Sequence, residues 1–211
     1  MTQIGDRRVA DSAVFAFLAL LSTVAAGTSA CAQLTKPPTL VVKQVVGPLE
    51  EGRPSPSAAV ILMQREKYPP KQIESLVVEL DRLTTAATSP MARLSAAQAL
   101  SNAGTGPTPV AGAFDRILSA YGRSDDALVR RAIVSLMSAQ HDRARAIAFL
   151  REVAIKPSQA QDFEGSAKTA VEALARMEKD GRAELIALKS KDAISDPAAS
   201  AYVNWFLSVK H

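Results

Sequence analysis

Cysteine, histidine and aromatic side chains are scarce in this sequence of 211 residues. It contains one cysteine, Cys31, and two histidines, His141 and His211, and aromatic residues make up only 5% of the chain. A single cysteine excludes an intramolecular disulfide framework and a thiolate metal cluster. We therefore expect the folded chain to be held together by packing alone.

The shortage of histidine also limits catalysis. His141 falls at an expected turn, where an exposed residue is the ordinary interpretation, and His211 ends the sequence. No serine stands in a G-x-S-x-G setting, and a conventional nucleophile–base pair needs a suitable cysteine or histidine. A Ser–Lys dyad would need neither, but no sequence context here marks one. Paired metal-ligand spacings and EF-hand loops are missing from the sequence as well. The sequence predicts a protein that is not an enzyme and takes neither a cofactor nor a metal.

Neither sign of charge dominates, since 25 basic and 21 acidic residues are mixed along the chain and leave a net charge of +4. Such a mixture is typical of a solvated helical surface, whereas nucleic-acid binders cluster their basic residues. The exception is a local group of arginines, at Arg130, Arg131, Arg143, Arg145 and Arg151. Acidic residues interrupt this group. We expect solvated helix faces here, with an anionic partner as the alternative and no nucleic acid.

The N-terminal region contains an uncharged apolar run over residues 13–26, preceded by Arg7 and Arg8 and followed by small residues. This run has 14 residues. That length suits the apolar region of a secretory signal peptide and falls short of the roughly 20 that span a bilayer. We expect residues 1–32 to be a signal peptide cleaved before Gln33. The protein would then be exported, to the periplasm or outside the cell.

Cys31 offers a second processing route. Small residues at Thr28, Ser29 and Ala30 precede it, as in the lipobox of a lipoprotein, although Thr28 stands where a leucine-like residue is usual. Lipidation of Cys31 would attach the exported protein to a membrane surface. Soluble export, a lipid anchor and an uncleaved anchor are therefore three alternatives, and a buried helix of a cytosolic protein is the fourth.

Residues 33–56 are rich in proline, a residue that interrupts helices. The prolines of this segment are Pro37, Pro38, Pro48, Pro54 and Pro56. Residues 39–46 are β-prone. We expect residues 33–56 to form an extended linker, or a tether if Cys31 carries lipid, and to contain no helix of any length.

From residue 57 onward the sequence predicts helices separated by short breaks. We expect them near residues 57–67, 71–86, 90–102, 109–121, 126–140, 142–155, 163–177, 181–189 and 197–209. Ser89-Pro90 and Asp196-Pro197 each pair an N-cap residue with proline at the first helical position. Because every gap is short, consecutive helices should be antiparallel neighbours.

An internal repeat runs through this helical part. Residues 93–100, 129–136 and 167–174 share a basic residue, small residues and a final leucine, with a period near 37. Two of these segments precede an explicit turn, which contains Asp142 or Asp180. An aspartate at such a turn can cap the second helix of the pair.

These segments resemble HEAT repeats, in particular the short bacterial phycobilisome-lyase-like type. The opening of that motif matches Val129 and Arg130, its middle matches Ala170, Ala173 and Leu174, and its turn matches Asp180, Arg182 and Ala183. Met177-Glu178-Lys179 departs from it before Asp180. The resemblance implies an all-α domain over residues 57–211. The expected form is a short right-handed α-solenoid of about four to five antiparallel helix pairs.

A HEAT-like solenoid implies a binding surface rather than an activity. We therefore expect an exported, non-enzymatic interaction or scaffold module whose partner is another protein. The alternatives are an enzyme or enzyme-assembly factor of the HEAT-like lyase type, and a structural subunit of a cell-envelope complex. Candidate contact residues are Arg130, Arg131, Tyr202 and Trp205. The last two belong to an aromatic cluster that would either bind a partner or seal the final repeat.

The lipoprotein alternative predicts the behaviour of a Cys31→Ala variant. If Cys31 carries lipid, the variant should leave the membrane fraction and should be processed differently, because its anchor is gone. Fractionation of cells and the size of the processed chain measure both effects. Unchanged membrane association and processing would exclude lipidation.

Overall fold

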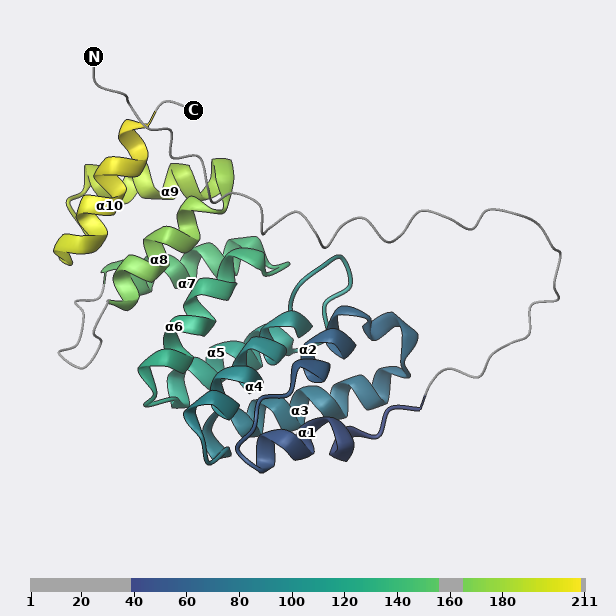
Figure 1. The fold of residues 1–211 in the computed structure, drawn as a ribbon. Coiled ribbons are helices and arrows are strands. Elements are labelled where there is room, and N and C mark those ends of the chain that lie inside the picture. The colour runs from purple at the N-terminus through teal and green to yellow at the C-terminus, as the bar shows by residue number, and fades with distance from the viewer. Residues whose placement is uncertain (1–38, 156–164, 210–211) are drawn as a thin grey trace, which may run out of the picture. The chain divides into compact units, whose positions relative to one another are not determined.

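The computed structural model describes residues 39–155 and 165–209, which form ten α-helices and no strand (Figure 1). The predicted all-α class is confirmed. The helices are α1 (Val42–Glu50), α2 (Pro56–Met63), α3 (Pro70–Ala86), α4 (Pro90–Ala103), α5 (Ala113–Arg123), α6 (Ala127–Leu136), α7 (Arg143–Ile155), α8 (Ser166–Ala175), α9 (Glu178–Ser190) and α10 (Pro197–Ser208). Short 3-10 helices at Arg65–Lys67 and Met137–Ala139 follow α2 and α6.

Helix starts that rest on local capping are predicted correctly. In each case a side-chain oxygen accepts a hydrogen bond from a backbone N–H of the first turn. The capping residues and donor–acceptor distances are Ser89 (3.1 Å), Asp126 (2.9 Å), Asp142 (3.2 Å) and Asp196 (2.7 Å). Pro70 begins α3, one residue before the predicted start at residue 71, and occupies the first helical position that proline favours.

The expectation of an extended linker up to residue 56 is wrong, because α1 lies within it. Val45, Val46 and Leu49 of α1 are buried in contact with the helical body. The helix packs against α3 and α4, so the folded body begins before residue 57. Pro48 leaves the carbonyl of Gln44 without its usual helical donor, but Gln44 is exposed and water can satisfy it. Burial of three apolar side chains therefore outweighs the local preference of the segment.

Helix α5 begins four residues later than predicted. Gly112 has a φ of 71°, in the left-handed region. A right-handed helix cannot continue through this conformation, so α5 begins only at Ala113. The N–H of Val110 donates to the carbonyl of Ala103 at 2.8 Å instead of joining a helix. The preceding segment is therefore tied back to the end of α4.

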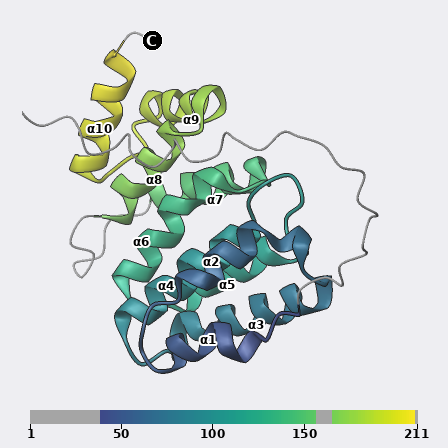
Figure 2. The same cartoon turned by 45° about the vertical axis from the view of Figure 1, so that its right-hand side comes forward.

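The helices pack in two alternating series (Figures 1 and 2). In the even-numbered series each helix packs on the next, from α2 through α4, α6 and α8 to α10. In the odd-numbered series α1 packs on α3, α3 on α5, and α7 on α9. The three repeat segments of the sequence fall on α4, α6 and α8, which are consecutive members of the even series.

Alanine fills much of the interface between even-numbered helices. Every alanine of α4 is fully buried, at Ala92, Ala96, Ala97, Ala99 and Ala103. Ala167, Ala170 and Ala173 of α8 are buried in the same way. Small side chains allow helix axes to approach closely, and leucines such as Leu100 and Leu174 fill the remaining space.

Ion pairs join consecutive helices of the odd-numbered series. They link α1 to α3, α3 to α5, α5 to α7 and α7 to α9 through Glu50–Arg82, Asp81–Arg123, Asp115–Arg145 and Glu184–Arg151. Most of these side chains are about half exposed, so solvent screens the pairs and each contributes little net stability. Their regular placement fixes which faces of the odd-numbered helices meet.

Helix α9 begins at Glu178, so the prediction that a turn containing Asp180 precedes it is wrong. The chain turns at Arg176 and Met177 instead. Gly181 lies in the first turn of α9, where a Cβ atom would stand 1.8 Å from the carbonyl oxygen of Leu174 in α8. The absence of a side chain at Gly181 therefore allows α8 and α9 to approach closely, and the glycine does not form a turn.

Two glycine-to-alanine substitutions should have opposite effects. Gly181→Ala should lower the free energy of unfolding by about 1–3 kcal/mol, because its new methyl group overlaps the Leu174 carbonyl. Gly122→Ala in α5 meets nothing within 4 Å and should raise it by roughly 0.5–1 kcal/mol through helix propensity. Urea unfolding followed by circular dichroism measures both. Equal effects would contradict the close approach of α8 and α9.

Candidate binding groove

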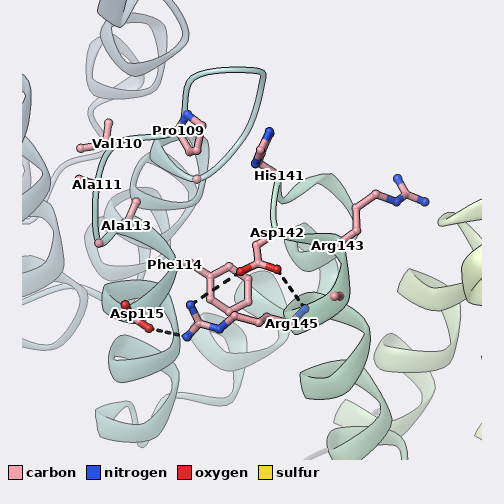
Figure 3. A pocket seen from close by; sticks show the side chains of 13 residues that line it. Pro109, Val110, Ala111, Ala113, Phe114, Asp115, His141, Asp142, Arg143 and Arg145 are labelled. Atoms are coloured by element: carbon pink, nitrogen blue, oxygen red, sulfur yellow. Dashed lines mark hydrogen bonds and ion pairs between the residues drawn. The ribbon is translucent and has the colours of Figure 1, made fainter.

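An open groove of about 560 Å³ lies between the N-terminal ends of α5 and α7 (Figure 3). Residues 109–111 and Phe114 form one wall, and residues 141–145 form the other. The walls meet at the base, where the N–H of His141 donates to the carbonyl of Gly104 at 2.9 Å. An isolated β-bridge between Thr105 and Gln140 lies beside this contact. The groove is therefore closed at one end by backbone pairing.

Further along both helices, α5 and α7 meet through an aromatic pair. The rings of Tyr121 and Phe149 lie 5.0 Å apart, edge to face, with an interplanar angle of 89°. Their contact is the favourable geometry for two aromatic side chains. It fixes the spacing of the two helices on one side of the groove, while the turn before each helix shapes the other.

Arg65 holds the wall of residues 109–111 from behind. Its Nε donates to the carbonyl of Thr108 at 2.7 Å, and its terminal nitrogens donate to the carbonyls of Asn102, Thr105 and Leu62. A guanidinium offers five donors in a fixed plane, so one side chain can satisfy several carbonyls of an irregular segment. The loop that forms the wall is thereby attached to the end of α2.

Arg145 organises the opposite wall. Its guanidinium pairs with Asp115 of α5 and with Asp142, and it lies 4.5 Å from the ring centroid of Phe114. The hydrogen bond to Asp115 raises the pKa of Arg145, and the charges of Asp115 and Asp142 raise it further against the cost of desolvation. Figure 3 shows this side chain reaching across from α7 to α5. Its charge is compensated within the groove.

The arrangement suits recognition of a peptide segment. Pro109, Val110, Ala111 and Ala144 supply apolar surface, while the paired charges at Arg145 can exchange hydrogen bonds with a polar backbone. His141 is exposed at the mouth of the groove. Among the described residues, no group of three or more His, Cys, Asp or Glu side chains is placed to hold a metal ion.

The arginine group predicted from the sequence is distributed over several contacts. Arg143 turns away from the groove and donates to the carbonyl of Met177 at 2.8 Å, and it pairs with Asp180. Arg145 and Arg151 pair with acidic side chains of α5 and α9. Arg130 and Arg131 are half-buried on α6 and do not line the groove.

The aromatic cluster of α10 lies elsewhere. Tyr202 and Phe206 are partly buried against the core, whereas Trp205 is 59% exposed. Burial raises the pKa of the Tyr202 phenol, and the charge of Glu172 raises it further. Because α8 packs against both α6 and α10, the structure does not bring Arg130 and Arg131 together with the aromatic cluster.

Sequence reasoning missed the groove itself. The sequence predicts the first turn of a helix at residues 109–111, where the structure has this wall, and no sequence pattern pairs Phe114 with Arg145. Gly112, which precedes α5 in the left-handed conformation, was the one local signal for the break. Cys31 and the predicted signal peptide, residues 1–32, lie outside the described residues. Within residues 39–155 and 165–209, no helix has the length and hydrophobicity needed to cross a membrane.

No protein-family model, curated protein or solved structure matches this chain. The resemblance to HEAT repeats therefore stays a prediction from the sequence motifs.

Replacing Arg65 should loosen the groove wall. In Arg65→Lys a single ammonium cannot reach the carbonyls of Thr105 and Thr108 together, so we expect a loss of about 1–3 kcal/mol in unfolding free energy. Hydrogen exchange of the Val110 amide should accelerate more than that of amides within α8. Arg53→Lys, at an exposed ion pair, is the matched control and should change neither quantity. Unchanged exchange at Val110 in Arg65→Lys would contradict the clamp.

Proposed function

We propose that this chain is an exported, non-enzymatic interaction module that binds another protein through a HEAT-like α-solenoid. The alternating contacts of even- and odd-numbered helices support the solenoid. Each helix packs on the next member of its own series, except that α5 and α7 meet mainly through the Tyr121–Phe149 pair. The repeat segments on α4, α6 and α8 support the HEAT-like type.

The groove between α5 and α7 is the observation that carries the binding function. It is open to solvent, has apolar surface at residues 109–111, and places compensated charges opposite that surface. A partner segment could bury apolar side chains against the first wall and pair its backbone with polar atoms of the second. Arg65 and the Arg145 contacts hold both walls before a partner arrives, which lowers the entropic cost of binding.

The two alternative functions, a lyase-type enzyme or assembly factor and a subunit of an envelope complex, differ in what the groove would have to bind. An enzyme or assembly factor of the lyase type needs a pocket lined by polar groups, whereas apolar residues dominate the wall at 109–111. A structural subunit of an envelope complex would use the same groove but keep its partner permanently. Export through residues 1–32 would bring the module to the periplasm or outside the cell, and a lipid at Cys31 would attach it to a membrane surface.

Filling the groove should remove the partner. Ala144 is exposed in the first turn of α7 and lines the groove, so Ala144→Trp should obstruct it without disturbing the core. Ala183→Trp, at an exposed alanine of α9 outside the lining, is the matched control. We expect affinity capture of the full chain from the envelope of its own cells, followed by mass spectrometry, to recover one defined protein. Its recovery should fall by roughly tenfold or more in Ala144→Trp only.

Melting temperatures of both variants establish that folding is retained. Equal recovery of the partner with both variants would place the binding surface outside the groove. A retained small molecule with no protein partner would contradict the proposed function and favour the lyase-type alternative. Recovery that withstands high salt and excess competitor would identify a permanent subunit.

A further inference from the structure

The last helix, α10, has no charged residue from Pro197 to Ser208. Ala199 and Val203 bury one side of it against α8 and α9. The opposite side is exposed, and no described helix packs beyond it, because α10 is the last member of the even-numbered series (Figure 1). Solenoids normally end in a helix with a polar outer face, which keeps the terminal unit soluble. Helix α10 departs from that rule.

The exposed side of α10 has the spacing of a helix–helix seam. Ala198, Ala201, Trp205 and Ser208 are separated by three, four and three residues, so they line one stripe. Ala198, Ala201 and Ser208 are exposed, and Trp205 is 59% exposed. The stripe therefore consists of one large side chain among small ones.

Trp205 is held in place before any partner binds. Its ring lies 5.5 Å from that of Tyr202, which in turn stacks on Phe206 at 6.4 Å. The guanidinium of Arg182 in α9 lies 5.5 Å from the ring centroid of Phe206, so the cluster is tied to the neighbouring helix. A large aromatic side chain fixed within an uncharged stripe of small residues is typical of an interface hot spot.

We propose that the exposed stripe of α10 binds the same stripe of a second copy of this chain, in an antiparallel pair with two-fold symmetry. In that pairing Trp205 of each copy faces Ala201 of the other, and Ala198 faces Ser208, so a large side chain always meets a small one. No charge on either helix opposes the contact, and the antiparallel helix dipoles favour it. A two-fold contact uses the same patch on both copies and closes the assembly at a dimer.

Other occupants fit the stripe less well. A charged partner would find no complementary charge along α10, and a head-to-tail contact would need a different patch on the other copy. The pairing does not depend on the groove between α5 and α7, since none of its residues lines that groove. Failure of one proposal therefore leaves the other standing.

The test uses the full chain in the form that cells produce. Sedimentation velocity from about 1 μM to about 1 mM covers the range of weak self-association. We expect a monomer–dimer equilibrium. Trp205 is the only tryptophan, so its fluorescence emission should shift to shorter wavelength as the dimer forms and buries it. A monomer over the whole range, or a dimer with unchanged emission, would overturn the proposal.

Substitutions identify the contact. Trp205→Glu should weaken dimerisation by roughly thirtyfold or more, whereas Met91→Glu, at an exposed methionine of α4, should leave it unchanged. Ala201→Trp alone places two large rings against each other and should also weaken the dimer. The combined Ala201→Trp and Trp205→Ala variant exchanges large and small positions and should recover it. Dimerisation that survives Trp205→Glu, or a double variant no better than Ala201→Trp alone, would overturn the pairing.

Discussion

The close approach of neighbouring helices, which small side chains allow, is the constraint on which the rest of this structure depends. Ala96, Ala97 and Ala99 occupy the interior of α4, and Gly181 lets α9 start almost against the carbonyl of Leu174. Contacts of this kind leave little room for rearrangement, because protein interiors are packed as densely as organic crystals. The even-numbered helices therefore form a continuous framework on which the odd-numbered helices are placed.

The odd-numbered helices pack on the even-numbered ones, as α3 does on α4 and α7 on α8, but they contact one another less uniformly, and the groove follows from that difference. Exposed ion pairs such as Glu50–Arg82 and Asp115–Arg145 join them, and such pairs contribute little stability each. Between α5 and α7 the contact is concentrated at Tyr121 and Phe149. The N-terminal ends of the two helices are left to be shaped by the segments before them. Arg65 and Arg145 then fix both walls through directed polar contacts rather than through dense packing.

The sequence predicts the fold best where the determining chemistry is local. Ser89, Asp126 and Asp196 predict helix starts because each side chain accepts a hydrogen bond only from the backbone of the turn that follows it in the sequence. Helix α1 was missed because its stability comes from Val45, Val46 and Leu49 meeting α3 and α4, which are distant in the sequence. The role of Gly181 is not predictable from the sequence, because the Leu174 carbonyl becomes its neighbour only once α8 and α9 are packed.

The candidate site was less predictable for the same reason. Phe114 and Arg145 are 31 residues apart, and their contact depends on how α5 and α7 are placed. Arg65 donates to backbone carbonyls about 40 residues away. Every residue has such a carbonyl, so the sequence does not show which ones accept. Tyr202 and Trp205 could be recognised because they are close in sequence on one helix. Their roles could not be separated, since exposure alone distinguishes Trp205 from its partly buried neighbour.

The two proposed binding surfaces lie on different helices and do not compete for the same residues. A groove on α5 and α7 and a pairing stripe on α10 can be occupied at once, because α10 contributes no lining residue to the groove. A dimer through α10 would then carry two grooves. A partner with two binding segments would meet the second groove at a high effective concentration, so weak single contacts would give firm attachment. An interaction module with a shallow groove would reach useful affinity in this way, without requiring any single contact to be strong.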